Sequence, residues 1–249
     1  MKTILLPLRV LGLMVLAAVM CIGVSSCNSD DDGPVVYNVQ EFATFVGNMG
    51  DRSEFSVQRT GNGPVYTLYG KGKVSEQAIK AGSRVLIAYQ LTAANDGATT
   101  PDATVSLPTG GEIDLISVYG VLTLTPKPVD IEADSVKNWN LNQVYLEQIS
   151  RTGAFINLIA RVECNSNELL KTFDLYVDSK TLDTKEPQLY IRYNRPQTMS
   201  STVFVPMSLN VNTYWNNPNY EGVTLNIANS KDPSRQRFQF LKKNEGFTD

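Results

Sequence analysis

The chain has 249 residues, with 22 basic and 25 acidic side chains, three cysteines and no histidine. Without histidine it has no Ser-His-Asp or Cys-His nucleophile system, no His-ligated zinc and no histidine pH switch. An acidic balance without a basic patch leaves no electrostatic footprint for nucleic acid.

The N-terminus has the parts of a secretory signal peptide. Lys2 and Arg9 make its start positive, and the fifteen residues 10–24 are uncharged and nearly all apolar. As a helix this run would be about 22 Å long at about 1.5 Å per residue, short of the ~30 Å hydrocarbon core of a bilayer. The length therefore favours a cleaved signal over an uncleaved transmembrane anchor, which stays the alternative.

A tetrad that resembles the bacterial lipobox ends this signal. Residues 24–27 read Val-Ser-Ser-Cys, an aliphatic residue and two small residues before a cysteine. In such signals a diacylglycerol is attached to the thiol, and several acyl chains give a stable anchor because each buried methylene contributes about 0.8 kcal/mol. We therefore predict that residues 1–26 are removed and that Cys27 is lipidated, with palmitate among its acyl chains. Cys21 lacks small residues before it and is a poor competing acceptor.

Residues 27–37 are predicted to be an acidic tether. Their Ser, Asp and Gly side chains cannot pack, so the segment stays solvated. The run resembles the Ser/Asp-rich export tag of surface lipoproteins from Gram-negative anaerobes, which favours the outer membrane and its cell-surface side over the periplasmic side. Cleavage leaves 20 basic and 25 acidic residues, a net charge of −5, so the acyl chains rather than basic side chains provide the membrane contact.

Cysteine use excludes an internal disulfide in the exported chain. Once Cys21 is discarded and Cys27 is acylated, Cys164 is the one remaining thiol. Stability must then come from apolar burial. Cys164 closes an apolar strand pattern, which favours a buried thiol over a reactive one.

Residues 38–126 alternate with a period close to two, the pattern of half-buried strands. The pattern predicts five strands and a short helix or turn between the third and fourth: 41–46, 54–58, 65–69, the helix or turn 76–80, 84–92, and a long strand 112–125 that can bend to serve two sheets. This is the plan of an OB-like β-barrel. No strand interleaves aromatics with Lys and Arg as a nucleic-acid stacking groove would.

Residues 127–138 are predicted to be a linker, because Pro126-Lys127-Pro128 and a polar stretch interrupt the alternation. Residues 139–249 resume it and predict an immunoglobulin-like β-sandwich with strands 143–149, 154–163, 170–178, 188–194, 203–211, 222–228 and 235–241. Pro206 cannot donate to a ladder and indicates an edge strand. Trp139, after the linker, is interpreted as a core plug or an interdomain wedge.

The mature chain resembles the NigD-like lipoproteins. The likeness is carried by residues 82–89 (Gly-Ser-Arg-Val-Leu-Ile-Ala-Tyr), Trp139 and residues 188–194 (Gln-Leu-Tyr-Ile-Arg-Tyr-Asn). The resemblance implies a lipidated cysteine at residue 27, an OB-like N-terminal domain and a C-terminal β-sandwich. The family is named for its association with a bacteriocin locus and brings no catalytic signature.

The candidate ligand-binding residues are Tyr214, Trp215 and Tyr220. They lie in a seven-residue stretch with asparagines, and rings with amides can recognise sugars. The competing and favoured interpretation is a hairpin loop with Trp215 plugging the core. A turn at 178–187 contains Asp178, Asp183 and Glu186 but lacks the spacing of a calcium loop, so no metal and no cofactor are predicted.

These observations predict a membrane-anchored, non-catalytic surface lipoprotein that acts as an interaction or ligand-binding module. A carbohydrate-binding accessory protein of a glycan-uptake system and a pilus-type structural subunit are the alternatives. A carboxylate-pair hydrolase stays open in principle, although nothing in the sequence selects a pair.

Overall fold

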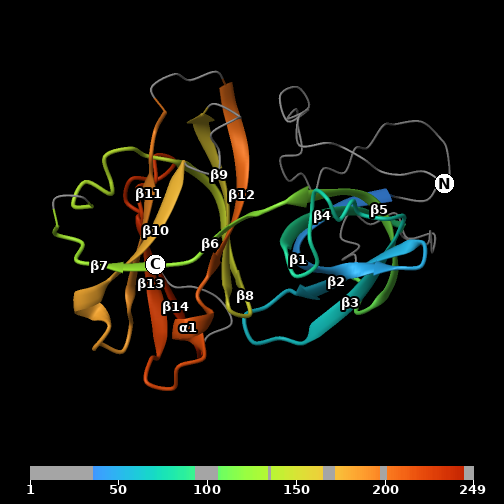
Figure 1. Cartoon of the computed structure of the whole chain (residues 1–249), viewed down its shortest axis with the longest axis horizontal. Helices are drawn as coiled ribbons and strands as arrows, with labels where there is room; N and C mark the ends of the chain where they lie inside the picture. The colour runs from blue at the N-terminus through green and yellow to red at the C-terminus, as the bar shows by residue number, and fades with distance from the viewer. Residues whose placement is uncertain (1–35, 93–105, 134–135, 165–171, 197–200, 244–249) are drawn as a thin grey trace, which may run out of the picture. The chain divides into compact units, whose positions relative to one another are not determined.

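The computed structural model describes residues 36–92, 106–133, 136–164, 172–196 and 201–243, and the regular secondary structure of these residues is almost entirely strand (Figure 1). Contacts divide them into two compact units. The first holds residues 36–57 and 65–120, and the second holds residues 58–64 and 121–243. The predicted all-β class, a barrel followed by a sandwich, is confirmed.

The first unit is a closed five-stranded barrel. Its strands are β1 (Val36–Met49), β2 (Arg52–Gln58), β3 (Val65–Lys71), β4 (Arg84–Thr92) and β5 (Gly111–Gly120). They close in the order β1-β2-β3-β5-β4, with β3 and β5 parallel and β4 antiparallel to both β1 and β5. This is the OB-like arrangement that the strand spacing predicted.

Strand β1 is longer than the predicted 41–46, because it serves two neighbours. Its first part, Val36–Thr44, pairs with β4, and its second part, from Ala43 on, pairs with β2. A bulge between Phe45 and Gly47 bends the strand so that it can follow the barrel wall. Because β1 begins at Val36, the predicted tether is shorter than 27–37.

The barrel core is formed by the inward side of each strand. Ala43 and Phe45 of β1 face inward, and the Phe45 and Phe55 rings lie 5.9 Å apart. The segment predicted as a helix or turn at 76–80 is a turn. The buried cluster is Ala43, Phe45, Phe55, Val57, Leu68, Val74, Val85, Ile87, Tyr89 and Ile113.

The second unit contains a five-stranded sheet and a four-stranded sheet. The five-stranded sheet has the order β14-β13-β11-β10-β7 and the four-stranded sheet the order β6-β12-β9-β8. Their bounds are β6 (Leu122–Leu124), β7 (Lys127–Val129), β8 (Tyr145–Thr152), β9 (Phe155–Cys164), β10 (Phe173–Asp178), β11 (Gln188–Tyr193), β12 (Ser201–Asn210), β13 (Gly222–Ile227) and β14 (Arg237–Leu241). The described residues of this unit also form two short helices, η3 (Ser179–Thr181) and α1 (Asn212–Trp215). One buried apolar cluster draws on both sheets, so the unit is a β-sandwich.

Residues 127–138 are not the linker that the prolines predicted. Lys127–Val129 is strand β7 and pairs in parallel with β10, while Ile131 and Val136 pack against Tyr176 of the same sheet. Because β7 is an edge strand, the backbone position of Pro128 can face away from β10, where no neighbouring strand requires an N–H donor. The predicted strand 112–125 is likewise divided: β5 belongs to the barrel unit, and β6 joins the sandwich.

Pro206 lies in β12, which has β9 on one side and β6 on the other. Strand β6 pairs only with Met207–Leu209, so the part of β12 that contains Pro206 has β9 as its partner. The predicted edge character therefore holds locally, although β12 is an inner strand of its sheet over the three residues that follow.

Replacing Phe45 tests the barrel core. Phe45 is fully buried, so Phe45→Ala should lower the free energy of unfolding of the barrel by about 3–5 kcal/mol through lost burial and a cavity. Val46 is 44% exposed, and Val46→Ala should change it by less than about 0.5 kcal/mol. Urea unfolding of both variants measures the difference; equal effects would contradict this assignment of inward and outward faces.

Candidate functional site

The predicted lipid anchor lies outside the described residues. Cys27 and the signal 1–26 precede Val36, where β1 begins. Within the described ranges, no helix combines the length and the apolar composition needed to cross a bilayer. Lipidation of Cys27 therefore stays a prediction from the sequence.

The stretch with Tyr214, Trp215 and Tyr220 contains helix α1 and the turn after it. Tyr214 is buried and belongs to the sandwich core. The Tyr220 hydroxyl donates a hydrogen bond to the Leu182 carbonyl oxygen at 2.9 Å, and the Tyr214 and Tyr220 rings lie 6.1 Å apart. Two of the three candidate rings are thus held by contacts within the sandwich.

Trp215 is half-buried and covers an arginine. The Arg151 guanidinium carbon lies 4.1 Å from the centroid of the Trp215 ring. Arg151 is 4% exposed, its Nη1 donates to the Gly153 carbonyl oxygen at 3.0 Å, and burial lowers its pKa. The indole face shields a buried cation, an interaction that is worth more when desolvated. A ligand role for the three aromatic residues remains a prediction.

The acidic turn at 178–187 uses its side chains locally. Asp178 caps helix η3 by accepting from the Lys180 backbone N–H at 3.1 Å, and Glu186 accepts hydrogen bonds from Thr224 and Gln239. Asp183 is exposed. In the ranges that the structure describes, no group of three His, Cys, Asp or Glu side chains could hold a metal ion.

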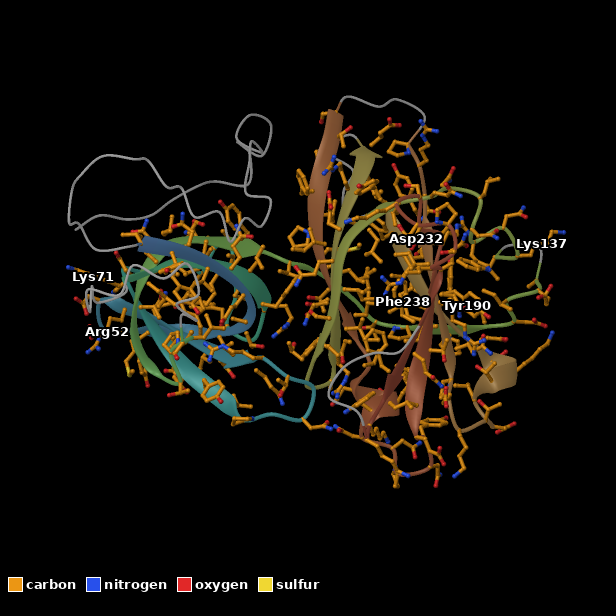
Figure 2. All side chains as sticks on the ribbon, turned by 180° about the vertical axis from the view of Figure 1, so that it is seen from behind. Arg52, Lys71, Lys137, Tyr190, Asp232 and Phe238 are labelled. Atoms are coloured by element: carbon orange, nitrogen blue, oxygen red, sulfur yellow. The ribbon has the colours of Figure 1, made fainter. Side chains whose placement is uncertain are left out.

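Trp139 lies outside the main sandwich core. Its ring meets the Tyr190 ring edge-on at 5.0 Å, in a smaller cluster with Ile131, Val136 and Tyr176. Tyr176 and Tyr190 are opposite each other on β10 and β11, so Trp139 covers the outer side of the five-stranded sheet, where Figure 2 labels Tyr190. These contacts lie within the second unit and outside its main core, so Trp139 does not plug the main sandwich core as one of its two predicted roles required.

A second group of aromatic and charged side chains, which sequence reasoning missed, lies on the outer side of the four-stranded sheet. In β9 the buried apolar positions are Ile156, Leu158, Ala160 and Val162, which alternate with Arg161, so Arg161 points to the outer side of the sheet. Its cross-strand neighbours are Tyr145 on β8 and Phe204 on β12. The guanidinium carbon lies 5.0 Å from the Tyr145 ring and 4.9 Å from the Phe204 ring. Arg161 is therefore held between two aromatic rings.

Ion pairs surround this arginine. Arg161 pairs with Glu147, which also pairs with Lys231 at 3.3 Å. The Lys231 ammonium lies 5.4 Å from the Tyr145 ring. Farther along β9, Glu163 pairs with Arg195 at 2.6 Å. The network fixes the charged heads on one region of the outer surface.

A cavity of about 460 Å³ opens beside the network, and we call it the Arg161 pocket. Its lining combines two arginines, amides, hydroxyls and two exposed apolar side chains: Leu141, Asn142, Gln143, Tyr145, Arg161, Val162, Glu163, Tyr193, Arg195, Thr202 and Ser230. These residues come from five stretches of chain. Val162 and Tyr193 lie on the buried faces of their strands, and the others read in the sequence as ordinary outward-facing or loop positions, so no local signal marks the pocket.

No protein-family model matches the chain, and no curated protein matches it. Solved structures do match it. A protein of unknown function, DUF1344, from Bacteroides vulgatus is 14% identical with a TM-score of 0.54, covering 82% of this chain and 90% of that one. A NigD-like immunity protein from Bacteroides caccae is 13% identical with a TM-score of 0.46 (84% and 91% covered). A candidate lipoprotein from Bacteroides fragilis is 8% identical with a TM-score of 0.45 (85% and 96% covered).

The likeness to the Bacteroides vulgatus protein shows a shared fold over both units, since it spans most of each chain. At 14% identity it does not extend to activity or to individual site residues.

Trp215→Ala tests what the indole does. Because Trp215 covers the buried Arg151 guanidinium, its removal should lower the free energy of unfolding of the sandwich by at least about 2 kcal/mol. Asn219→Ala, an exposed change in the same stretch, should shift it by less than about 0.5 kcal/mol. Thermal or urea unfolding provides the measurement. A Trp215→Ala protein as stable as the wild type would instead assign the indole to a surface role.

Proposed function

We propose that the chain is a non-catalytic lipoprotein, anchored through Cys27 in the bacterial outer membrane and exposed at the cell surface, where it acts as an interaction or ligand-binding module. The tetrad Val-Ser-Ser-Cys at 24–27, after a charged start and a fifteen-residue apolar run, carries the proposal. The likeness in order and patterning to the NigD-like lipoproteins supports the same address.

The distance between the anchor and the first strand suits such a display. Eight residues, 28–35, separate Cys27 from Val36. The nine residue steps from Cys27 to Val36 span at most about 32 Å when fully extended, at about 3.5 Å per residue. An acylated Cys27 would thus hold the start of β1 within that distance of the lipid headgroups. The Asp-rich composition of the spacer favours a solvated conformation.

The composition supports binding rather than catalysis. The absence of histidine from the whole chain removes the common nucleophile and zinc systems. Strand positions that face outward on a rigid sheet, as Tyr145 and Arg161 do, supply fixed groups for recognition. A module of this kind can offer one defined surface to a ligand or partner without a conformational change.

Cys27→Ala tests the anchor. The variant should leave the membrane fraction or accumulate with its signal uncleaved, and it should take up no palmitate label, because the thiol that accepts the lipid is gone. Cys21→Ala, a matched change six residues earlier, should be processed and labelled as the wild type is. Fractionation, labelling and intact mass provide the readouts; a Cys27→Ala protein that is labelled and cleaved normally would refute the proposal.

Surface exposure has its own test. Protease added to intact cells should digest the wild-type chain, because the proposal places both β units outside the outer membrane. A periplasmic protein expressed in the same cells is the control and should stay intact. Protection of the chain until the cells are lysed would place it on the periplasmic side instead.

A further inference from the structure

On one side of the Arg161 pocket, the guanidinium of Arg161 is held in a fixed position by its neighbours. Arg161 lies between the Tyr145 and Phe204 rings, and its carboxylate partner Glu147 is only 19% exposed. These contacts fix the plane of the guanidinium before any ligand arrives, which lowers the entropy lost on binding. The Nε atom of Arg161 is buried and has no hydrogen-bond partner among the described residues.

The second arginine of the pocket, Arg195, can bind a ligand anion more readily than Arg161 can. Arg195 and Glu163 form an ion pair at 2.6 Å, but their side chains are 47% and 52% exposed. Exposed pairs of this kind contribute about 0–1 kcal/mol. A ligand carboxylate can therefore replace Glu163 as the partner of Arg195 at little energetic cost and gain a charge-assisted, two-point hydrogen bond.

The charges around the pocket favour an anion. Arg161, Arg195 and Lys231 contribute three positive charges to the ion pairs described above, against two negative charges from Glu147 and Glu163. The mature chain as a whole has 20 basic and 25 acidic residues. A local positive excess on an acidic protein attracts anionic ligands to this region.

The rest of the lining suits a polyhydroxylated molecule. Gln143 offers an amide, and the exposed Thr202 and Ser230 offer hydroxyls, which can donate and accept. Asn142 offers its amide oxygen, because its nitrogen donates to the Tyr193 carbonyl oxygen at 3.1 Å. Leu141 is 75% exposed and adds an apolar surface at the rim. The volume of about 460 Å³ lies within the range of about 300–1,000 Å³ that is usual for small-ligand sites.

We propose that the Arg161 pocket binds a saccharide that carries a carboxylate, such as a uronic or sialic acid unit, with its carboxylate at Arg195 and Arg161 and its hydroxyls at the amides and hydroxyls of the lining. The inference rests on the proposed function as a binding module and names its ligand class. An acidic peptide would use the two arginines but leave most of the hydrogen-bonding groups of the pocket unmatched.

Binding is measured by titration calorimetry on the full mature protein in detergent micelles. The probes are trigalacturonate with its methyl ester, and sialyllactose with lactose, so that each acid has a neutral counterpart of the same shape or core. At least one acid should bind, and its neutral counterpart should bind at least tenfold more weakly. Tetraglutamate should also bind at least tenfold more weakly than that acid.

Arg195→Gln is the main variant because Arg195 is exposed and its loss should leave the fold intact. It should weaken acid binding at least tenfold, and Arg161→Gln should do the same. Arg52→Gln is the matched control, since Arg52 also forms an exposed 2.6 Å pair, with Glu112, but lies in the barrel. It should bind the acid as the wild type does.

Several results would overturn the proposal: no binding of either acid, equal binding of acid and neutral probe, tetraglutamate binding as tight as that of the sugar, or an Arg195→Gln protein with unchanged affinity. Membrane fractionation of the Arg195→Gln protein separates this question from the anchor. If that protein stays in the membrane fraction, a failure in calorimetry rejects the ligand class and leaves the proposed lipoprotein function standing.

Discussion

The second unit depends on the ladder between β9 and β12. Ten consecutive residues of β12 pair with β9, from Ser201 opposite Cys164 to Asn210 opposite Phe155. Because side chains alternate along a strand, this register sends Leu158 and Val205 into the core and leaves Arg161 and Phe204 outside. A slip of one residue would exchange the two sets, burying Arg161 in apolar surroundings. Core and pocket are therefore fixed by the same ladder.

Two arginines of the four-stranded sheet show that the face of the sheet on which an arginine lies decides whether it serves the core or the outer surface. Arg151 lies at the end of β8 opposite the buried Ile156, is 4% exposed and is covered by the Trp215 ring. Arg161 lies on the other face between two rings, with its charge at the rim of a cavity. Both use an aromatic face to stabilise a guanidinium. The inward one closes the core, whereas the outward one is available for recognition.

The barrel and the sandwich each reach stability through apolar burial rather than covalent links. The barrel cluster is centred on Phe45, Phe55 and Tyr89, all fully buried, and the Tyr89 hydroxyl donates to Glu41 at 3.0 Å. The sandwich cluster is larger and takes side chains from both sheets. With Cys164 as the one thiol left after the predicted lipidation, no disulfide within the exported chain can add to this.

The sequence by itself determined most of the strands and predicted the address. Alternation of period two located the five barrel strands and seven sandwich strands, since a pleated strand with one buried face must alternate. The lipobox predicts an anchor at Cys27 because its chemistry is local to four residues. The length of β1, the strand β7 within the predicted linker and the contacts of Trp139 needed the tertiary structure. In each case pairing or packing between distant segments overrode the local signal that proline or a polar stretch gave.

The Arg161 pocket is the clearest example of what only the tertiary structure decided. Tyr145, Arg161 and Phe204 are separated by 16 and 43 residues along the chain and become neighbours through strand register alone. Register depends on the sum of many buried contacts along both ladders, and no single residue encodes it. The sequence therefore determined which residues face outward on each strand, and the pairing of the strands decided which of them meet.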